Sequence, residues 1–280
     1  MRFHKSGSPI TGLDEWKARA GPKRSDQWAE GRSAMEVARA WLADAPRLPA
    51  EIGQLLAGHP AFGPCLDWSA EPEVRLRFDG LAGEPRNSDL LVLAEDRHGP
   101  YLMAVEAKAD EPFGSTVAEV LTEAVERRLV TPRSNAITRV EQLAAAIVGP
   151  RRPRELRLGG LRYQLLTAAA GAAAEASRRG IARVLLLVHE FWTDRTDDER
   201  HWDNAAALTD FVGRLAHDEM VGCGGGELVG PFALPGKPLF PPTQQFYVGK
   251  AVRNVRAGVA NNTQLRSGPG AGHRTQRPVE

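Results

Sequence analysis

Two apolar runs, residues 90–94 and 101–105, restrict most strongly what this chain can fold into. Neither run alternates apolar with polar residues, which is typical of strands that are covered by helices on both faces. The residues between them, 95–100, are polar and end in Gly-Pro, so we expect the two runs to pair as an antiparallel hairpin. A further apolar run, 181–188, follows a predicted helix. Helices that alternate with buried strands exclude an all-β or an all-helical fold and predict the α/β or mixed α+β class, with helices flanking a central mixed sheet.

Other elements are predicted from the spacing of apolar residues. A helix begins at Ser33, because apolar residues recur from there at the i, i+3, i+4, i+7 spacing, and it ends before Pro46. The stretch that follows, through residue 72, has no regular period, and residues 74–78 then alternate as in a half-buried strand. The remaining predicted elements are helices at about 115–130, 135–148, 161–179 and 203–217 and strands at 227–232 and 245–251.

The domain organisation is predicted from the same patterns. Residues 1–29 mix Gly, Pro, Lys and Trp without a period, and we interpret them as an irregular lead-in. Residues 30–252 form a single predicted domain. Residues 253–280 hold five arginines and one glutamate among Gly, Asn, Pro and Gln. That composition cannot bury enough apolar surface to order itself, so the segment is predicted to be a mobile basic tail.

Composition excludes several classes of protein. The 36 Lys and Arg residues are balanced by 35 Asp and Glu residues, which excludes a polycation that coats nucleic acid indiscriminately. Cys65 and Cys223 are too few for a disulfide framework or a four-ligand zinc site, which favours a reducing compartment. No stretch reaches the roughly 18 apolar residues of a membrane span. We therefore expect a cytoplasmic protein without a membrane partner.

Charged residues interrupt the buried strands at one place. Asp89 opens the first strand of the predicted hairpin, and Glu106 and Lys108 lie two residues apart at the end of the second strand. Residues two apart in a strand share one face. If the turn is symmetric, Ala94 pairs with Tyr101, and Asp89 then lies opposite Glu106. The hairpin therefore predicts two carboxylates and one ammonium group at the same end of the sheet.

Two opposed carboxylates repel each other unless a cation lies between them. Magnesium is the expected cation, with manganese as a second choice, because it accepts one or two carboxylates, keeps several waters and leaves room for a substrate phosphate. Lys108 would orient an attacking water or stabilise the charge of a phosphoryl transition state. A plain ion pair at a strand end is the alternative, and the spacing leaves both possibilities open.

These residues carry a resemblance to a known superfamily. Asn87-Ser88-Asp89 before an apolar strand, followed by Val105-Glu106-Ala107-Lys108, resembles the Asp and Glu-x-Lys pattern of the PD-(D/E)XK, or restriction-endonuclease-like, nucleases. The predicted order over roughly residues 30–190 is similar to the αβββαβ core of that superfamily. Segments 31–36, 106–114 and 161–166 further resemble an uncharacterised bacterial branch of it. One departure is that no proline precedes Asp89.

The resemblance implies a metal-dependent nuclease that hydrolyses phosphodiester bonds, in DNA rather than RNA. Asp89 and Glu106 would be metal ligands, the Ala107 carbonyl a third ligand, and Lys108 would lie beside the nucleophilic water. Members of the superfamily also lose activity and keep the fold. The alternative is therefore a catalytically inactive module that binds nucleic acid or a protein partner, and a homodimer is left open.

Four further residues are weighed as part of the site. Glu36 is a candidate for the first-helix acid of the superfamily, but Ser33 and Glu36 have the spacing of a capping box, which we favour. Gln164 lies at the edge of the apolar face of its helix and is equally a site residue or a buried hydrogen-bonding residue. Glu111 is a minor candidate, since a solvated loop carboxylate is more common. His189 is interpreted as structural.

A basic loop is the candidate region for phosphate contacts. Its arginines are Arg151, Arg152, Arg154 and Arg157. Arginines in such a loop suit contacts that position a nucleic acid without reading its sequence, whereas an Arg-Pro-rich loop is more often only a solvated connection.

Overall fold

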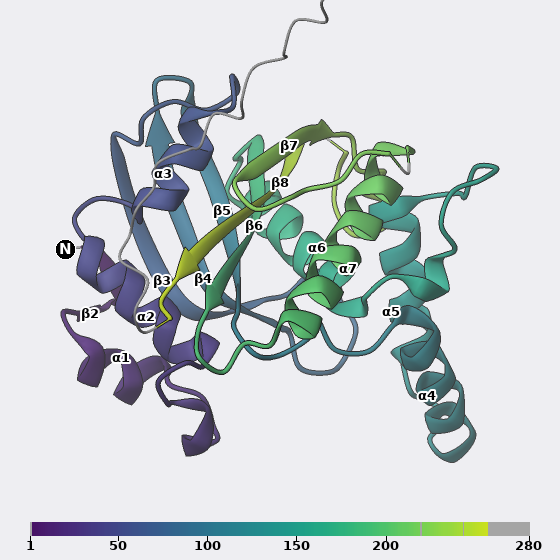
Figure 1. The fold of residues 1–280 in the computed structure, drawn as a ribbon. Helices are drawn as coiled ribbons and strands as arrows, with labels where there is room; N and C mark the ends of the chain where they lie inside the picture. Colours follow the sequence, from purple (N-terminus) through teal and green to yellow (C-terminus); the bar gives the residue numbers. More distant parts are fainter. Residues whose placement is uncertain (1, 219, 243, 257–280) are drawn as a thin grey trace, which may run out of the picture.

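The fold is built on an eight-stranded mixed sheet, in the strand order β2-β1-β3-β4-β5-β6-β8-β7, with helices on its faces (Figure 1). The computed structural model describes residues 2–218, 220–242 and 244–256. The strands are β1 (Phe3–Lys5), β2 (Ser8–Ile10), β3 (Asp67–Leu76), β4 (Arg86–Asp96), β5 (Gly99–Lys108), β6 (Arg183–Trp192), β7 (Glu227–Phe232) and β8 (Gln245–Asn254). The α-helices are α1 (Leu13–Ala20), α2 (Ser33–Asp44), α3 (Ala50–Ala57), α4 (Val117–Val130), α5 (Ala136–Leu143), α6 (Tyr163–Arg178) and α7 (Asp198–Ala216). Short helical turns are η1 (Ser25–Gln27), η2 (Ala144–Val148) and η3 (Leu158–Gly160).

The central hairpin has the predicted register. Ala94 pairs with Tyr101, and the antiparallel pairing of β4 with β5 continues back to Leu90 and Val105. Strand β3 is antiparallel to β4, whereas β6 runs parallel to β5. The predicted mixed α/β class is therefore confirmed.

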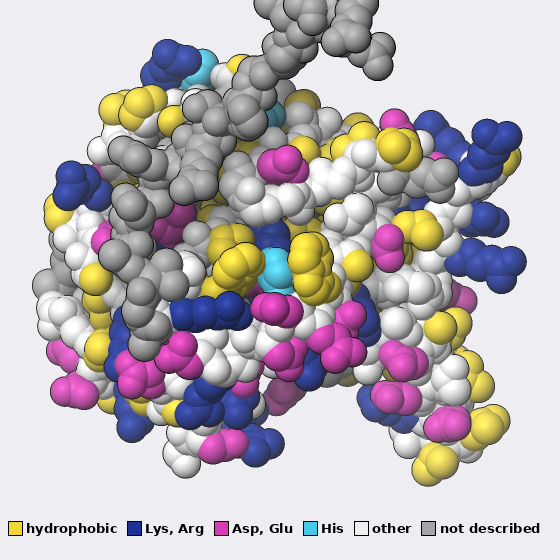
Figure 2. Space-filling view, in the orientation of Figure 1, with side chains coloured by type: hydrophobic (Ala, Val, Ile, Leu, Met, Phe, Trp, Pro, Cys, Tyr) yellow, Lys and Arg dark blue, Asp and Glu magenta, His cyan; other side chains and the backbone are white. Residues whose placement is uncertain are grey.

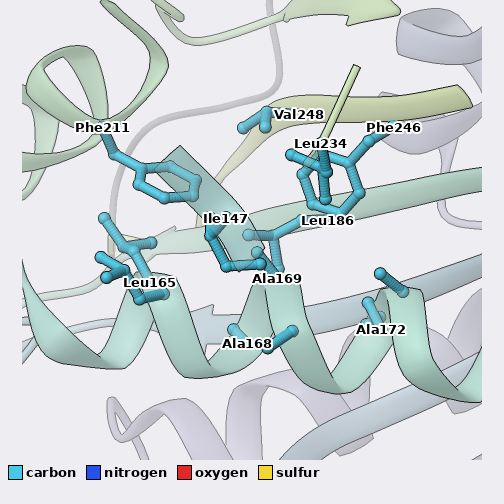
Figure 3. Close-up of a cluster of buried hydrophobic side chains, with 14 of the residues drawn as sticks. Ile147, Leu165, Ala168, Ala169, Ala172, Leu186, Phe211, Leu234, Phe246 and Val248 are labelled. Carbon is cyan, nitrogen blue, oxygen red and sulfur yellow. The ribbon is translucent and has the colours of Figure 1, made fainter. Parts of the chain in front are cut away.

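Helices cover both faces of the central strands, as the continuous apolar runs predict. On one face, Val105 lies in a core with Trp41 of α2. On the other face, α6 contributes Leu165 and Ala169 to a second core that contains Leu186 of β6 (Figure 3). Alanine leaves little side chain between helix and sheet, so α6 lies close to the strands that carry the candidate site.

The prediction of an irregular lead-in at residues 1–29 is wrong. This segment contains β1, β2 and α1, and Phe3, Ile10 and Trp16 are buried. The ring centroids of Phe3 and Trp16 lie 5.2 Å apart. Strands of three residues are too short to show a period in the sequence. Strand β1 is ordered by pairing with β3, where Phe3 meets Ala70, and β2 is ordered by pairing with β1.

Three other boundaries differ from the prediction. Helix α3 lies inside the stretch that has no regular period, and β3 begins at Asp67 instead of residue 74. Helix α7 begins at Asp198, because the Asp197 side chain accepts a hydrogen bond from the Arg200 N–H and caps the helix. The predicted tail also begins too early, since Arg253 belongs to β8 and pairs with Glu51 at 2.7 Å. Residues 257–280 lie outside the described residues.

Two compositional features have a structural counterpart. Both cysteines are free, and burial raises the pKa of Cys223 to about 12. Among the described residues, no helix has the length and apolar character needed to cross a membrane.

Candidate active site

The structure brings Asp89, Glu106 and Lys108 together at one end of the β4–β5 hairpin. Glu106 and Lys108 continue the side of β5 that carries Ala104, which faces α6. The Asp89 carboxylate accepts a hydrogen bond of 2.7 Å from the N–H of Ala107, the residue between Glu106 and Lys108. The predicted approach of two carboxylates and one ammonium group is therefore present.

Glu106 is the hub of the cluster. Only 2% of its surface is exposed, and one carboxylate oxygen lies 3.0 Å from Lys108 Nζ. The same oxygen accepts from the Gln164 amide of α6, and the other oxygen pairs with Arg86. Burial alone would raise the pKa of Glu106, but the charges of Arg86 and Lys108 outweigh burial and lower it. Glu106 is therefore held as a carboxylate with two cations and one amide around it.

The pKa of Asp89 is shifted in the opposite direction to that of Glu106. Burial of its carboxyl, together with the charge of Glu106, raises the pKa of Asp89 well above the ordinary value of 3.8. The charge of Glu73 adds to this effect, and burial likewise raises the pKa of Glu73. Ionisation of Asp89 is thus opposed by burial and by two neighbouring carboxylates, although Lys108 and Arg86 act in the other direction.

Lys108 is protonated in this arrangement. Burial opposes its charge, yet Glu106 and Asp89 together raise the pKa of Lys108. Its Nζ also lies 5.1 Å from the centroid of the Phe113 ring, a cation–π contact. Lys108 therefore offers a fixed positive charge and hydrogen-bond donors.

A pocket of about 680 Å³ opens beside the cluster. Arg86, Lys108 and Gln164 line it together with Glu111 and Tyr163. Pockets of roughly 300–1,000 Å³ are typical of small-ligand sites. The pocket gives a substrate group access to Lys108, which is otherwise buried.

Glu111 lies closer to the site than a solvated loop carboxylate would. It lines the pocket, and burial raises its pKa although Lys108 and a hydrogen bond with Ser33 act in the other direction. Asp110 pairs with Arg32 at 2.7 Å. These contacts fasten the loop after β5 to the beginning of α2.

The donor set fits a magnesium ion. Among the described residues, no group of three or more His, Cys, Asp or Glu side chains is arranged to hold a metal, but magnesium needs only one or two carboxylates beside waters and substrate. A divalent cation beside Asp89 would offset the repulsion between its carboxylate and that of Glu106. The Ala107 carbonyl points to the same side of β5 as its N–H, toward Asp89. Arg86 would compete with the metal for Glu106.

Other predicted residues lie elsewhere. Glu36 accepts a hydrogen bond of 2.8 Å from the Gly31 N–H, lies 3.5 Å from Arg39, and lines a different pocket. It secures the chain before α2, as favoured, but the predicted capping box is wrong because the N-cap is Arg32 and its side chain makes no capping bond. His189 is fully buried, and its ring nitrogens lie 3.3 Å from Trp41 Nε1 and 2.8 Å from Glu51.

The arginines of the basic loop do not line the pocket. Arg151, Arg152, Arg154 and Arg157 are exposed, and dark-blue side chains project at the edge of the molecule where this loop lies (Figure 2). Their role in contacting phosphates remains a prediction.

Arg86 is the site residue that sequence reasoning missed. It begins β4, three residues before Asp89, and its spacing alone gives no reason to place it against Glu106. An arginine next to the motif was the only available signal.

Comparison with known proteins gives one match. A family model described as a domain of unknown function (DUF6946) matches residues 9–243. No curated protein and no solved structure matches.

Proposed function

The chain belongs to the DUF6946 family, a domain of unknown function, so its activity has to be argued from its own residues, and we propose that it is a metal-dependent nuclease. Its reaction would be the hydrolysis of phosphodiester bonds, in DNA rather than RNA, with magnesium as the preferred ion and manganese as a substitute. One observation carries the proposal. Asp89, Glu106 and Lys108 meet beside a pocket that Lys108 and Gln164 line, with Gln164 donating to Glu106 from α6.

The order of elements supports the same proposal. Helix α2, strands β3, β4 and β5, helix α6 and strand β6 occur in the order of the αβββαβ core of the restriction-endonuclease-like superfamily, with α3 inserted before β3 and with α4 and α5 inserted before α6. The three strands form an antiparallel meander that carries the motif, and β6 lies beside β5. We propose that the chain has this core.

Each residue has a distinct part in the proposed reaction. A bound magnesium ion would lower the pKa of a water and balance the charge of the phosphoryl group. Asp89 and Glu106 supply the carboxylates for that ion. Lys108 holds a positive charge at the pocket, where it stabilises charge that develops on the phosphoryl oxygens. Gln164 fixes the orientation of Glu106.

One observation favours the inactive module as a second candidate. Both oxygens of Glu106 already have partners, since Arg86, Lys108 and Gln164 surround them. A carboxylate that is fully paired can be a structural part of the fold. In this second candidate the same surface binds nucleic acid or a protein partner without cleaving it.

Cleavage and metal binding separate the two candidates. Supercoiled plasmid, single-stranded DNA and RNA are incubated with the protein and Mg²⁺, Mn²⁺ or EDTA, and the metals are titrated calorimetrically. The variants are Asp89→Asn, Glu106→Gln and Lys108→Met, with Glu175→Gln as control, since Glu175 lies on α6 in ion pairs with Arg178 and Arg179. The nuclease proposal expects metal-dependent cleavage in the wild type and the control alone. Absence of cleavage, with metal binding indifferent to Asp89, would establish the module instead.

A further inference from the structure

A second pocket lies at the carboxyl ends of β6 and β8. We call it the Trp pocket, defined by Trp192, His201, Trp202, Lys250 and the turn 224–226, which line a volume of about 630 Å³. It shares no lining residue with the pocket beside Lys108. Figure 2 shows a histidine flanked by hydrophobic side chains near the middle of this face, over the region of β6 and α7.

The polar floor of the Trp pocket is a buried network around Glu190. Lys250 Nζ lies 3.0 Å from the Glu190 carboxylate, His201 Nδ1 lies 2.9 Å from it, and Trp192 Nε1 donates to it at 3.3 Å. Only 2% of Lys250 and 1% of Glu190 are exposed. An ammonium group has three donors, and Glu190 is its one side-chain partner among the described residues. The remaining donors of Lys250 are therefore available to an acceptor in the pocket.

The wall of the pocket is aromatic. The ring centroids of Trp192 and His201 lie 4.5 Å apart, and those of His201 and Trp202 lie 5.5 Å apart. Trp202 is 68% exposed, although an indole of that size is usually covered. Trp192 Nε1 lies 3.3 Å from the Glu190 carboxylate and 3.1 Å from His201 Nδ1, so these contacts hold the inner part of the wall in place. A flat ring that stacks on Trp202 would cover this exposed surface.

The Trp pocket lies next to the candidate active site along the sheet. Glu190 is the register partner of Lys108 in the parallel pair β5–β6, so the two residues occupy neighbouring strands and the same face. Adjacent strands are about 4.8 Å apart. The alternating charges Glu106, Lys108, Glu190 and Lys250 thus run across three adjacent strands from one pocket to the other.

We propose that the Trp pocket binds one unpaired nucleobase of a single-stranded nucleic acid, with the ring stacked on Trp202 and an acceptor on the edge of the base bound by Lys250. This inference rests on the proposed nuclease function and specifies its substrate as single-stranded. Base–aromatic stacking tolerates every base, because each base has a π-face, while the buried cation selects a ring that carries hydrogen-bond acceptors. An aliphatic peptide side chain would satisfy the indole surface but leave Lys250 without an acceptor.

Binding without turnover tests the inference. The protein carries Asp89→Asn and is kept in EDTA, so that no cleavage occurs, and labelled oligothymidylate is titrated against an oligonucleotide of equal length with abasic sites. Stacking of one base contributes about 1–3 kcal/mol, which corresponds to a preference of about 5- to 150-fold for the oligonucleotide with bases. Adding Trp202→Ala should remove most of that preference and Trp202→Phe should retain it. Leu129→Ala, which changes an exposed apolar residue of α4, should leave it unchanged.

Each remaining outcome decides the inference. Equal binding of the two oligonucleotides overturns it, as does a Trp202→Ala variant that keeps the full preference for bases. If Trp202→Ala leaves the affinity for both oligonucleotides unchanged but shifts the oligomeric state, the inference is also overturned, and the pocket holds a second copy of the chain. A base preference that depends on Trp202, in a wild-type protein that cleaves nothing, removes the nuclease proposal and leaves the base site standing. Cleavage by a protein that shows no base preference removes the base site and leaves the nuclease proposal standing.

Discussion

Replacement of Asp89 by asparagine should stabilise the protein at neutral pH while removing the proposed activity. Asn is nearly the same shape, and its carbonyl still accepts the hydrogen bond of the Ala107 N–H. The change removes a buried negative charge that lies beside Glu106. Burial and the charge of Glu106 are the two main causes that raise the pKa of Asp89.

The expected gain follows from the register of the hairpin. The pair Leu90 and Val105 is the last one of β4 and β5 at this end, and Asp89 and Glu106 are the next residues outward on the two strands. The Cβ atoms of residues opposite each other on paired strands lie up to about 5.5 Å apart. Two like charges at that distance repel by about 3 kcal/mol at an effective dielectric constant near 20. Lys108 and Arg86 offset part of this repulsion. We expect a net gain of about 1–2 kcal/mol, or roughly 2–6 °C in Tm for a chain of this size.

The pH dependence has a definite sign. Because the folded state binds the Asp89 proton more tightly than the unfolded state, ionisation of Asp89 costs stability at every pH above the ordinary pKa of 3.8. The cost grows with pH until the raised pKa is reached. The advantage of Asp89→Asn should therefore be largest at neutral pH and vanish as the pH falls toward 3.8.

Urea unfolding of wild type and variant, followed by tryptophan fluorescence in EDTA over this pH range, measures the effect. Asp96→Asn is the control, because it should lower the free energy of unfolding where Asp89→Asn raises it. Burial would raise the pKa of Asp96, but Arg183 and the N–H groups of Gly63 and His98 lower it. Its charge stabilises the fold above the ordinary pKa, so Asp96→Asn should lose about 3–5 kcal/mol at neutral pH. An Asp89→Asn protein that is no more stable than wild type at neutral pH would refute the reasoning.

Three further changes have expected outcomes. Arg86→Gln removes the cation that competes for Glu106, so calorimetry should show Mg²⁺ binding about 5-fold tighter (~1 kcal/mol); weaker binding would mean that Arg86 assists the metal site. Gln164→Ala releases one oxygen of Glu106, so kcat of nucleic-acid cleavage should fall about 5-fold, the value of one hydrogen bond, with KM unchanged. A rise in KM alone would place Gln164 in substrate binding. Trp16→Ala should cost about 3–5 kcal/mol in urea unfolding, and a loss below 1 kcal/mol would contradict the burial of α1 against the sheet.

Local patterns were sufficient for the central part of the fold. The two runs at 90–94 and 101–105 are apolar throughout, and that pattern specifies strands that must be covered on both faces whatever the rest of the chain does. The short turn between them set the register, because few residues join the two strands. The positions of Glu106 and Lys108 on one face followed from the period of two residues in a strand.

Features without a local period were beyond prediction. Strands β1 and β2 are three residues long, and the pair is ordered because β1 pairs with β3, far away in sequence. Helix α3 lies between prolines and glycines that break the pattern around it. The capping box at Ser33 had the correct spacing, but Ser33 bonds Glu111 instead, a residue that only the folded chain brings near.

The amino-acid sequence by itself determined which strands are buried, how the hairpin pairs, and which three charged residues stand at its end. Only the tertiary structure decided which groups surround them. Gln164 lies 58 residues from Glu106, and Arg86 lies 20 residues from it. Burial and periodicity are properties of neighbouring residues, whereas the charge balance at Asp89 is a sum over groups that distant elements deliver to one point.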